Sequence, residues 1–185
     1  MKKVVALLLA LVMMLCLVAC GGDEKKPEAP ASPAEVKGET YDTGAFTALI
    51  PEGWLAVPVS DMWSDDANAK DPSALQIIKG GESEWDLFTK PYIQINHYGP
   101  EEEMMEPWKD MYDGATDIAE FTTGALTWKG FTAKDLLENE MMILWTAGDA
   151  AGNQYTLTAY AKTDAGSFTV QDADVQALLG SLAGK

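Results

Sequence analysis

The sequence predicts an α+β domain in which two helices pack on the faces of a twisted antiparallel sheet. Several segments after residue 40 alternate apolar and polar residues, which is the pattern of half-buried strands. Short clusters of turn residues separate these segments, so neighbouring strands can pair as hairpins. Two further segments carry apolar residues at helical spacing. Strands joined by hairpins, with a helix in mid-chain and another at the end, indicate this class.

Six stretches have the alternation and length of strands. The most regular is 92–98, which places Ile93, Ile95 and His97 on one face. The turn cluster Pro51-Glu52-Gly53 separates the first two stretches. The expected strands are residues 46–50, 54–57, 74–79, 92–98, 141–147 and 154–162.

Two loops indicate hairpins in the second half of the chain. Residues 124–135 contain Lys129-Gly130, about which we expect a hairpin turn. Residues 148–153, rich in Gly, Asp and Asn, join the last two expected strands.

The first expected helix covers residues 101–112. It begins with three glutamates, which the helix dipole favours in a first turn. Pro107 lies inside it, so the helix is either kinked or begins only near this proline. The apolar stripe consists of Met104, Trp108, Met111 and Tyr112.

The second expected helix covers residues 172–183. Asp172 is a suitable N-cap, and Gly184 follows the end. Its buried stripe consists of Val175, Leu178, Leu179 and Leu182.

The first 19 residues have the form of a secretory signal. Met1-Lys2-Lys3 is positive, and residues 4–18 contain no charge, glycine or proline. A membrane span needs about 20 apolar residues, so this run is short for a plain membrane anchor, which is the alternative. The run ends in Leu17-Val18-Ala19-Cys20, which resembles the bacterial lipobox.

The lipobox resemblance implies cleavage after Ala19 and a diacylglyceryl group on the Cys20 sulfur. It often also implies a fatty acid such as palmitate on the new amino terminus. Two or three acyl chains on one residue make release from a membrane slow. We therefore expect a lipoprotein held by Cys20 on the extracytoplasmic face of the cell membrane.

Residues 20–40 form the expected lipidated cysteine and tether. The stretch is rich in Pro, Glu and Lys and lacks aromatic residues. It cannot bury enough apolar surface to offset its ordering entropy, so we expect it to be disordered. Residues 41–185 then form a single globular domain.

The charge of the chain excludes some partners. The formal net charge is -16, and the sequence contains no arginine. Neutralising nucleic-acid phosphates needs clustered Lys or Arg, so we expect no nucleic-acid binding. The acidity serves solubility outside the cytoplasm or, alternatively, provides a face for cations or a basic partner. Both cysteines precede the domain, which excludes thiol catalysis and cysteine-ligated zinc within it.

Residues 46–54, Phe-Thr-Ala-Leu-Ile-Pro-Glu-Gly-Trp, resemble the opening hairpin of the PsbP-like (Mog/PsbP-type) superfamily. Residues 176–182 are similar to the last helix of that family. The resemblance implies an α/β/α sandwich around a central antiparallel sheet. Members include accessory and assembly proteins, and the motif carries no catalytic residue to transfer.

Catalytic constellations are not evident in the sequence. His97 is the one histidine, which excludes a two-histidine metal site or an HExxH helix in a single chain. On an apolar strand face it is expected to be a buried, hydrogen-bonded side chain. No Gly-x-Ser-x-Gly, Walker loop or GxGxxG occurs. We therefore expect no enzyme activity, no cofactor and no nucleotide.

Calcium is the best metal candidate, because it prefers oxygen ligands. The weak candidates do not match an EF-hand, and the alternative is a solvated acidic loop. They lie within one expected loop and are Asp61, Asp65, Asp66, Asn68 and Asp71.

Six tryptophans divide into two groups. Trp54, Trp128 and Trp145 lie in expected strands and should be core residues, and Trp108 lies on the helical stripe. Trp63 and Trp85 lie in polar loops, where aromatic side chains mark a contact surface or fold back over the sheet edge.

Two functional hypotheses follow. The first is a non-catalytic accessory or protein-binding lipoprotein at the cell envelope, which contacts an envelope protein through Trp63 and Trp85. The alternative is a small-ligand or cation-binding lipoprotein, with calcium as the cation.

Overall fold

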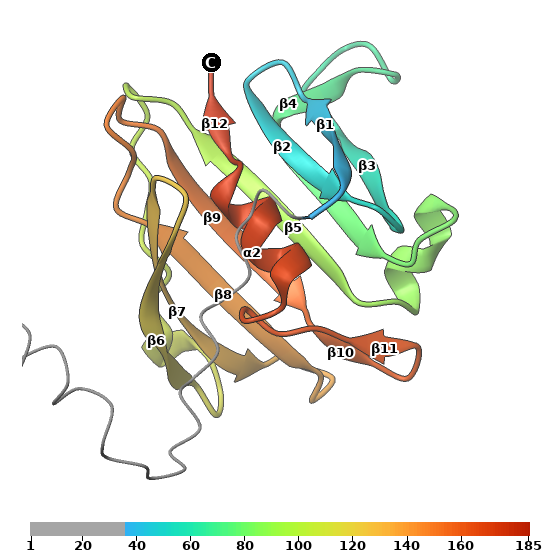
Figure 1. Cartoon of the computed structure of the whole chain (residues 1–185), viewed down its shortest axis with the longest axis vertical. Coiled ribbons are helices and arrows are strands. Elements are labelled where there is room, and N and C mark those ends of the chain that lie inside the picture. The colour runs from blue at the N-terminus through green and yellow to red at the C-terminus, as the bar shows by residue number, and fades with distance from the viewer. Residues whose placement is uncertain (1–35) are drawn as a thin grey trace, which may run out of the picture.

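The computed structural model describes residues 36–185, which form a mostly β structure around one large sheet (Figure 1). The large sheet has seven antiparallel strands. In spatial order they are β3 (Trp54–Ser60), β4 (Lys70–Lys79), β5 (Tyr92–Tyr98), β9 (Gln154–Tyr160), β8 (Glu140–Thr146), β7 (Leu126–Lys134) and β6 (Thr116–Thr123).

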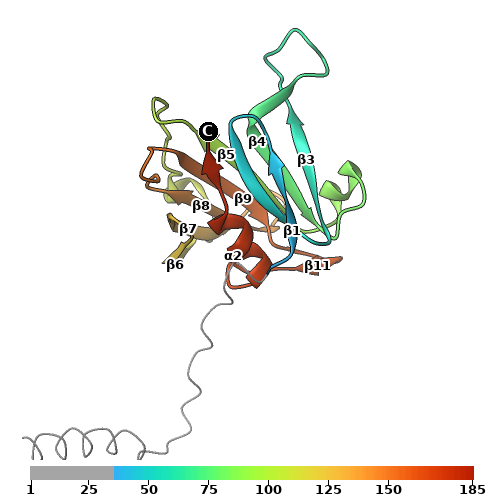
Figure 2. The ribbon, with the colours of Figure 1, turned by 45° about the horizontal axis from the view of Figure 1, so that its top comes forward.

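A second layer packs on one face of the large sheet (Figures 1 and 2). It consists of a small antiparallel sheet, in the order β1-β2-β12, and one short helix, α2. The bounds are β1 (Gly38–Asp42), β2 (Phe46–Pro51), β12 (Ala183–Gly184) and α2 (Ala173–Gly180). Smaller elements are the hairpin β10 (Lys162–Thr163)–β11 (Gly166–Ser167) and the 3-10 turns η2 (Glu84–Phe88) and η3 (Lys109–Met111).

The core lies between these two layers. Alternating residues of the central strands point inward, because side chains in a strand alternate between its faces. Thus β5 buries Ile93, Ile95 and His97 and leaves the residues between them half exposed. Phe46 of β2 and Leu178 of α2 close the core from the other layer and are fully buried.

The expected α/β/α sandwich is wrong. The described chain contains one α-helix, α2, and that helix shares its layer with the small sheet. The opposite face of the large sheet is covered by no α-helix among residues 36–185. The fold implied by the PsbP-like resemblance is therefore not present.

The expected helix at 101–112 does not form. Apart from the short turn η3, the segment is not helical, and Trp108 and Met111 point to solvent. Pro107 removes a backbone donor and clashes with the preceding turn of a helix, which explains the failure. Tyr112 does pack inward, on Phe131 of β7, with ring centroids 5.2 Å apart.

Helix α2 is shorter than expected, because the chain leaves it at Gly180 and enters β12. Gly180 contacts the turn between β6 and β7, where a side chain would meet Thr123 Oγ1 at 2.7 Å. Asp172 occupies the N-cap position, where its carboxylate accepts a hydrogen bond from Thr169 Oγ1 at 2.8 Å. Leu182 is buried as expected, but it lies beyond the helix.

The hairpin expected about Lys129-Gly130 is also wrong. Strand β7 runs straight through these residues, and the turn lies at Gly124, whose φ is 59°. Gly130 instead allows close strand packing, since a side chain there would come within 2.3 Å of the Ile143 carbonyl oxygen. Strand β6, which precedes the turn, had no counterpart among the expected strands.

Strand register places two groups of connections at opposite ends of the molecule. One end of the molecule is where β1 begins, and we call it the attachment end. It also holds η2, residues 135–139 and the β10–β11 hairpin (Figure 1). The far end holds residues 61–69, residues 148–153 and β12. Strand β1 begins at Gly38. Residues 38–40, which the composition assigned to the tether, therefore belong to the folded domain. In the part described, no helix is long and apolar enough to span a bilayer.

Candidate functional site

The structure separates the two tryptophans that the sequence grouped as one contact surface. Trp63 lies in the far-end loop and is 97% exposed, whereas Trp85 lies in η2 at the attachment end and is 70% exposed. The length of β3 lies between them, which is about 20 Å for a seven-residue strand. Neither ring folds back over the sheet edge, so each belongs to a separate surface.

The far-end loop, residues 61–69, is held in shape by its own polar side chains. The backbone N–H of Trp63 donates to Asp61 Oδ1 at 2.9 Å, and the N–H of Asn68 donates to Asp66 Oδ1 at 2.9 Å. The N–H of Asp61 donates to the carbonyl of Ala69 at 3.0 Å and closes the base of the loop. Short polar side chains that bind neighbouring backbone groups are typical of ordered turns. The loop therefore presents its exposed aromatic ring from a defined backbone.

The calcium candidates are not brought together as ligands. Asp61 and Asp66 accept backbone hydrogen bonds within the loop, and Asp71 accepts hydrogen bonds from the backbone N–H and hydroxyl of Ser73. Among residues 36–185, no three acidic or histidine side chains are placed to share a metal ion. Asp65 and Asn68 are exposed in the far-end loop, whereas Asp71 lies in strand β4 and outside the loop in which the sequence placed it.

His97 takes part in a polar chain that ties the loop at 148–153 to β5. Its Nε2 lies 3.0 Å from Asn153 Oδ1, and Asn153 Nδ2 donates to both carboxylate oxygens of Asp149. Burial of Asp149 raises its pKa, but hydrogen bonds from Asn153 and from the following backbone N–H groups lower it, and the net shift of the pKa is downward. The imidazole is 7% exposed and packs between the rings of Phe46 and Tyr155. The chain is thus a buried structural network whose imidazole partner is an amide, with no serine in it.

The attachment end carries an apolar surface that sequence reasoning missed. We call it the apolar end cluster, and it consists of Trp85 and Phe88 of η2 together with Leu136 and Leu137 of the β7–β8 loop. The rings of Trp85 and Phe88 stack with centroids 6.3 Å apart. Phe88 and Leu137 line a common cleft of about 950 Å³. A signal was present in Leu136-Leu137, an apolar pair set between charged residues in a short loop.

The floor and rim of that cleft are polar and charged. Tyr92 and Tyr160 stack on its floor with centroids 5.3 Å apart, and burial raises the pKa of both hydroxyls. Three lysines line the cleft, each paired with an acid. The pairs are Lys90–Asp86 at 3.2 Å, Lys134–Glu138 at 2.7 Å and Lys162–Glu140 at 3.8 Å.

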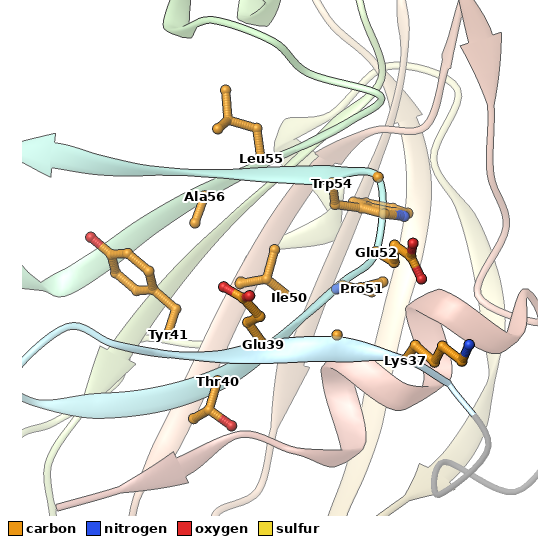
Figure 3. Close-up of a pocket in the computed structure, with 12 residues that line it drawn as sticks. Lys37, Glu39, Thr40, Tyr41, Ile50, Pro51, Glu52, Trp54, Leu55 and Ala56 are labelled. Atoms are coloured by element: carbon orange, nitrogen blue, oxygen red, sulfur yellow. The ribbon is translucent and has the colours of Figure 1, made fainter.

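Two smaller clefts open elsewhere. One of about 670 Å³ lies between the edge strands β1 and β3, and Figure 3 shows Tyr41 and Ala56 facing one another across it while Leu55 points away. The other, of about 610 Å³, lies between residues 167–170 and strands β6 to β8. Its apolar lining includes Ile118, Met142, Phe168 and Val170.

No family model matches the chain, and no curated protein matches it significantly. Ala19 and Cys20, the expected cleavage and lipidation residues, lie outside the described residues. The functional argument therefore depends on the chemistry of this chain alone.

Proposed function

We propose that this protein is a lipid-anchored extracytoplasmic lipoprotein with a non-catalytic, protein-binding role at the cell envelope, and that Trp63 binds its partner. The observation that carries the proposal is the far-end loop, which exposes Met62 at 91% and Trp63 at 97% from a backbone ordered by hydrogen bonds. Large side chains exposed in this way on an ordered loop are typical of binding anchors.

The position of the loop supports this role. The anchor is the lipid on Cys20, and the domain joins the tether at the attachment end, where β1 begins. The loop at residues 61–69 lies at the other end of β3 and β4. A partner in the periplasm or at the cell surface therefore meets the far end of an anchored domain first.

The chemistry of the loop specifies the partner. Tryptophan is among the commonest interface hot spots, and a loop that is already ordered loses little conformational entropy on binding. Asp61, Asp65 and Asp66 lie in the same loop as Trp63 and make it negatively charged. The complementary surface is an apolar pocket rimmed by Lys or Arg, since complementary potentials steer association.

The test compares two exposed tryptophans at opposite ends. Detergent-solubilised envelopes are passed over the wild-type protein, Trp63→Ala and the matched control Trp85→Ala. A hot-spot tryptophan contributes about 2 kcal/mol or more, so Trp63→Ala should weaken capture of the same partner by about 30-fold. Trp85→Ala should capture it as the wild type does. Equal recovery of every captured protein by all three would contradict the proposal.

A second candidate function is small-ligand binding, favoured by the apolar cleft beside Phe168 and Val170. A ligand that binds the folded state raises the melting temperature. A thermal shift with a panel of apolar and amphipathic solutes decides, and Ala161→Trp, which places a large side chain at a half-buried lining position, is the control variant. A flat response across the panel removes this candidate. The calcium-binding hypothesis has no support from the carboxylate geometry, because the candidate carboxylates accept hydrogen bonds from nearby backbone N–H groups.

A further inference from the structure

We infer that the attachment end of the domain rests on a neutral lipid bilayer, with the apolar end cluster entering the headgroup region of the membrane that holds the Cys20 lipid. This inference depends on the proposed lipid anchor and deepens it. It assigns to Trp85 a role different from that of Trp63.

The first step is that two separate connections place exposed apolar side chains at the same end of the domain, around one cleft. Trp85 and Phe88 come from η2, and Leu136 and Leu137 come from the β7–β8 loop about 50 residues later along the chain, yet Phe88 and Leu137 border the same cleft. Their exposed fractions lie between 70% and 102%. Large exposed apolar side chains gathered at one end, with polar groups around them, mark an interaction site for proteins or membranes.

The second step is the position of the tether. Sixteen residues, 20–35, separate the proposed lipidated cysteine from the described chain, and a stretch of this length reaches at most about 55 Å. It joins the domain at the same end as η2, because the N–H of Glu52 donates to the carbonyl of Lys37 and the N–H of Gly80, at the end of β4, donates to the carbonyl of Gly53. The apolar end cluster therefore lies on the side of the domain from which the chain runs to the membrane.

The third step is the chemistry of the surface. Tryptophan and phenylalanine favour the headgroup level of a bilayer, and leucine favours the acyl boundary. Lys90, Lys134 and Lys162 line the same end and can reach lipid phosphates from their long stems. Their acidic partners keep the end from being a positive patch, which favours zwitterionic over strongly anionic lipid.

A weak membrane contact is enough to set the orientation of a domain that is already anchored. The tether keeps the attachment end within a few nanometres of the bilayer, so binding becomes an intramolecular event at high effective concentration. Four side chains are then enough to bias the orientation of the domain and to hold Trp63 away from the membrane.

The experiment places one spin label at each end of the lipidated full-length mature protein in phosphatidylcholine vesicles. The labelled variants are Leu137→Cys in the cluster and Met62→Cys in the far-end loop, which are matched as exposed positions. Because the acylated Cys20 has no free thiol, each introduced cysteine is the only reactive one. For each spin label, the accessibility to oxygen, which concentrates in lipid, is compared with the accessibility to a water-soluble nickel chelate.

The label at residue 137 should show an oxygen-to-nickel accessibility ratio several-fold higher than the label at residue 62. Equal ratios in protein that floats with the vesicles overturn the membrane contact and leave the lipid anchor standing. Failure to float overturns the anchor itself. A label at 137 that is shielded in native envelopes and water-exposed in pure lipid vesicles also overturns the inference and assigns the cluster to a protein partner. Unchanged thermal melts of both variants show that the labels report on an intact fold.

Discussion

Replacement of Gly124 by alanine tests how the helix closes the core. Gly124 forms the β6–β7 turn with a φ of 59°, and a side chain there would lie 2.1 Å from the carbonyl oxygen of Gly180 at the end of α2. The same contact includes a hydrogen bond from Thr123 Oγ1 to the carbonyl of Gln176 at 2.9 Å. The turn and the helix end are thus packed backbone against backbone.

The magnitude has two parts. Alanine at a left-handed φ costs about 1 kcal/mol. The clash is with backbone and not with the tip of a flexible side chain, so α2 must shift, and repacking a crowded core costs about 1–3 kcal/mol more. The free energy of unfolding should therefore fall by about 2–4 kcal/mol for Gly124→Ala.

A matched control separates the two parts. Gly114 has a φ of 65°, and a side chain there would meet no atom within 4 Å. Gly114→Ala should therefore lose only the conformational part, about 1 kcal/mol. Urea unfolding followed by far-UV circular dichroism measures both variants. Equal losses for the two would refute the packing of α2 against the β6–β7 turn.

Three further predictions concern stability. Asn153→Ala leaves the buried His97 imidazole without its partner and should lower the free energy of unfolding by about 1–3 kcal/mol in urea titrations. A free energy of unfolding equal to that of the wild type would contradict the role of this hydrogen bond. The folded-state pKa of Asp149 is lowered, so its contribution to stability is present above the ordinary carboxyl pKa and is lost as pH falls through the folded value. Asp149→Asn should therefore be less stable than the wild type at pH 7, and this difference should shrink as pH falls below the ordinary carboxyl pKa of about 4. A constant gap between the two across that range would contradict this. Leu178→Ala, at a fully buried site, should lower the free energy of unfolding by about 2–5 kcal/mol, whereas Trp63→Ala should stay within about 0.5 kcal/mol of the wild type. Calorimetric melts that rank the two variants in the other order would contradict the burial of these side chains.

The strands could be predicted where alternation was regular. Residues 92–98 alternate without a break, and β5 has these bounds. The turn at residues 51–53 separates β2 from β3 because proline and glycine interrupt regular pairing there. In β6, Asp117, Ile118 and Glu120 give no clean alternation, and its pairing with β7 shifts register between Ile118 and Phe121, so no local signal marked it.

The helix at 101–112 shows the limit of a periodic pattern. Met104, Trp108 and Met111 have helical spacing, but they share no buried face: Trp108 and Met111 are exposed and Met104 is only half-buried. Packing of an amphipathic face supplies most helical stability in proteins. With Pro107 inside the segment and the turn closed by a hydrogen bond from Gly99 N–H to the Glu102 carboxylate, the extended form prevails.

The candidate surfaces were partly predictable. Polar neighbours left two alternatives for Trp63 and Trp85, exposure or packing back over the sheet edge, and both side chains are exposed. Their separation to opposite ends depends on the pairing of β3 with β4, which no local pattern reveals. The cluster of Phe88 with Leu137 likewise depends on the strand order of the whole sheet, because the two side chains come from different connections.

The lipid on Cys20 is the claim on which both proposals depend, and mass spectrometry of the amino-terminal peptide tests it most directly. Protein isolated from its native membranes is digested after lysine, and the peptide that begins at Cys20 is analysed for acyl groups. We predict a peptide whose mass includes a diacylglyceryl group on the cysteine, and Cys20→Ser should yield no such peptide. A native chain that begins at Met1, or a Cys20 with an unmodified thiol, would contradict the account.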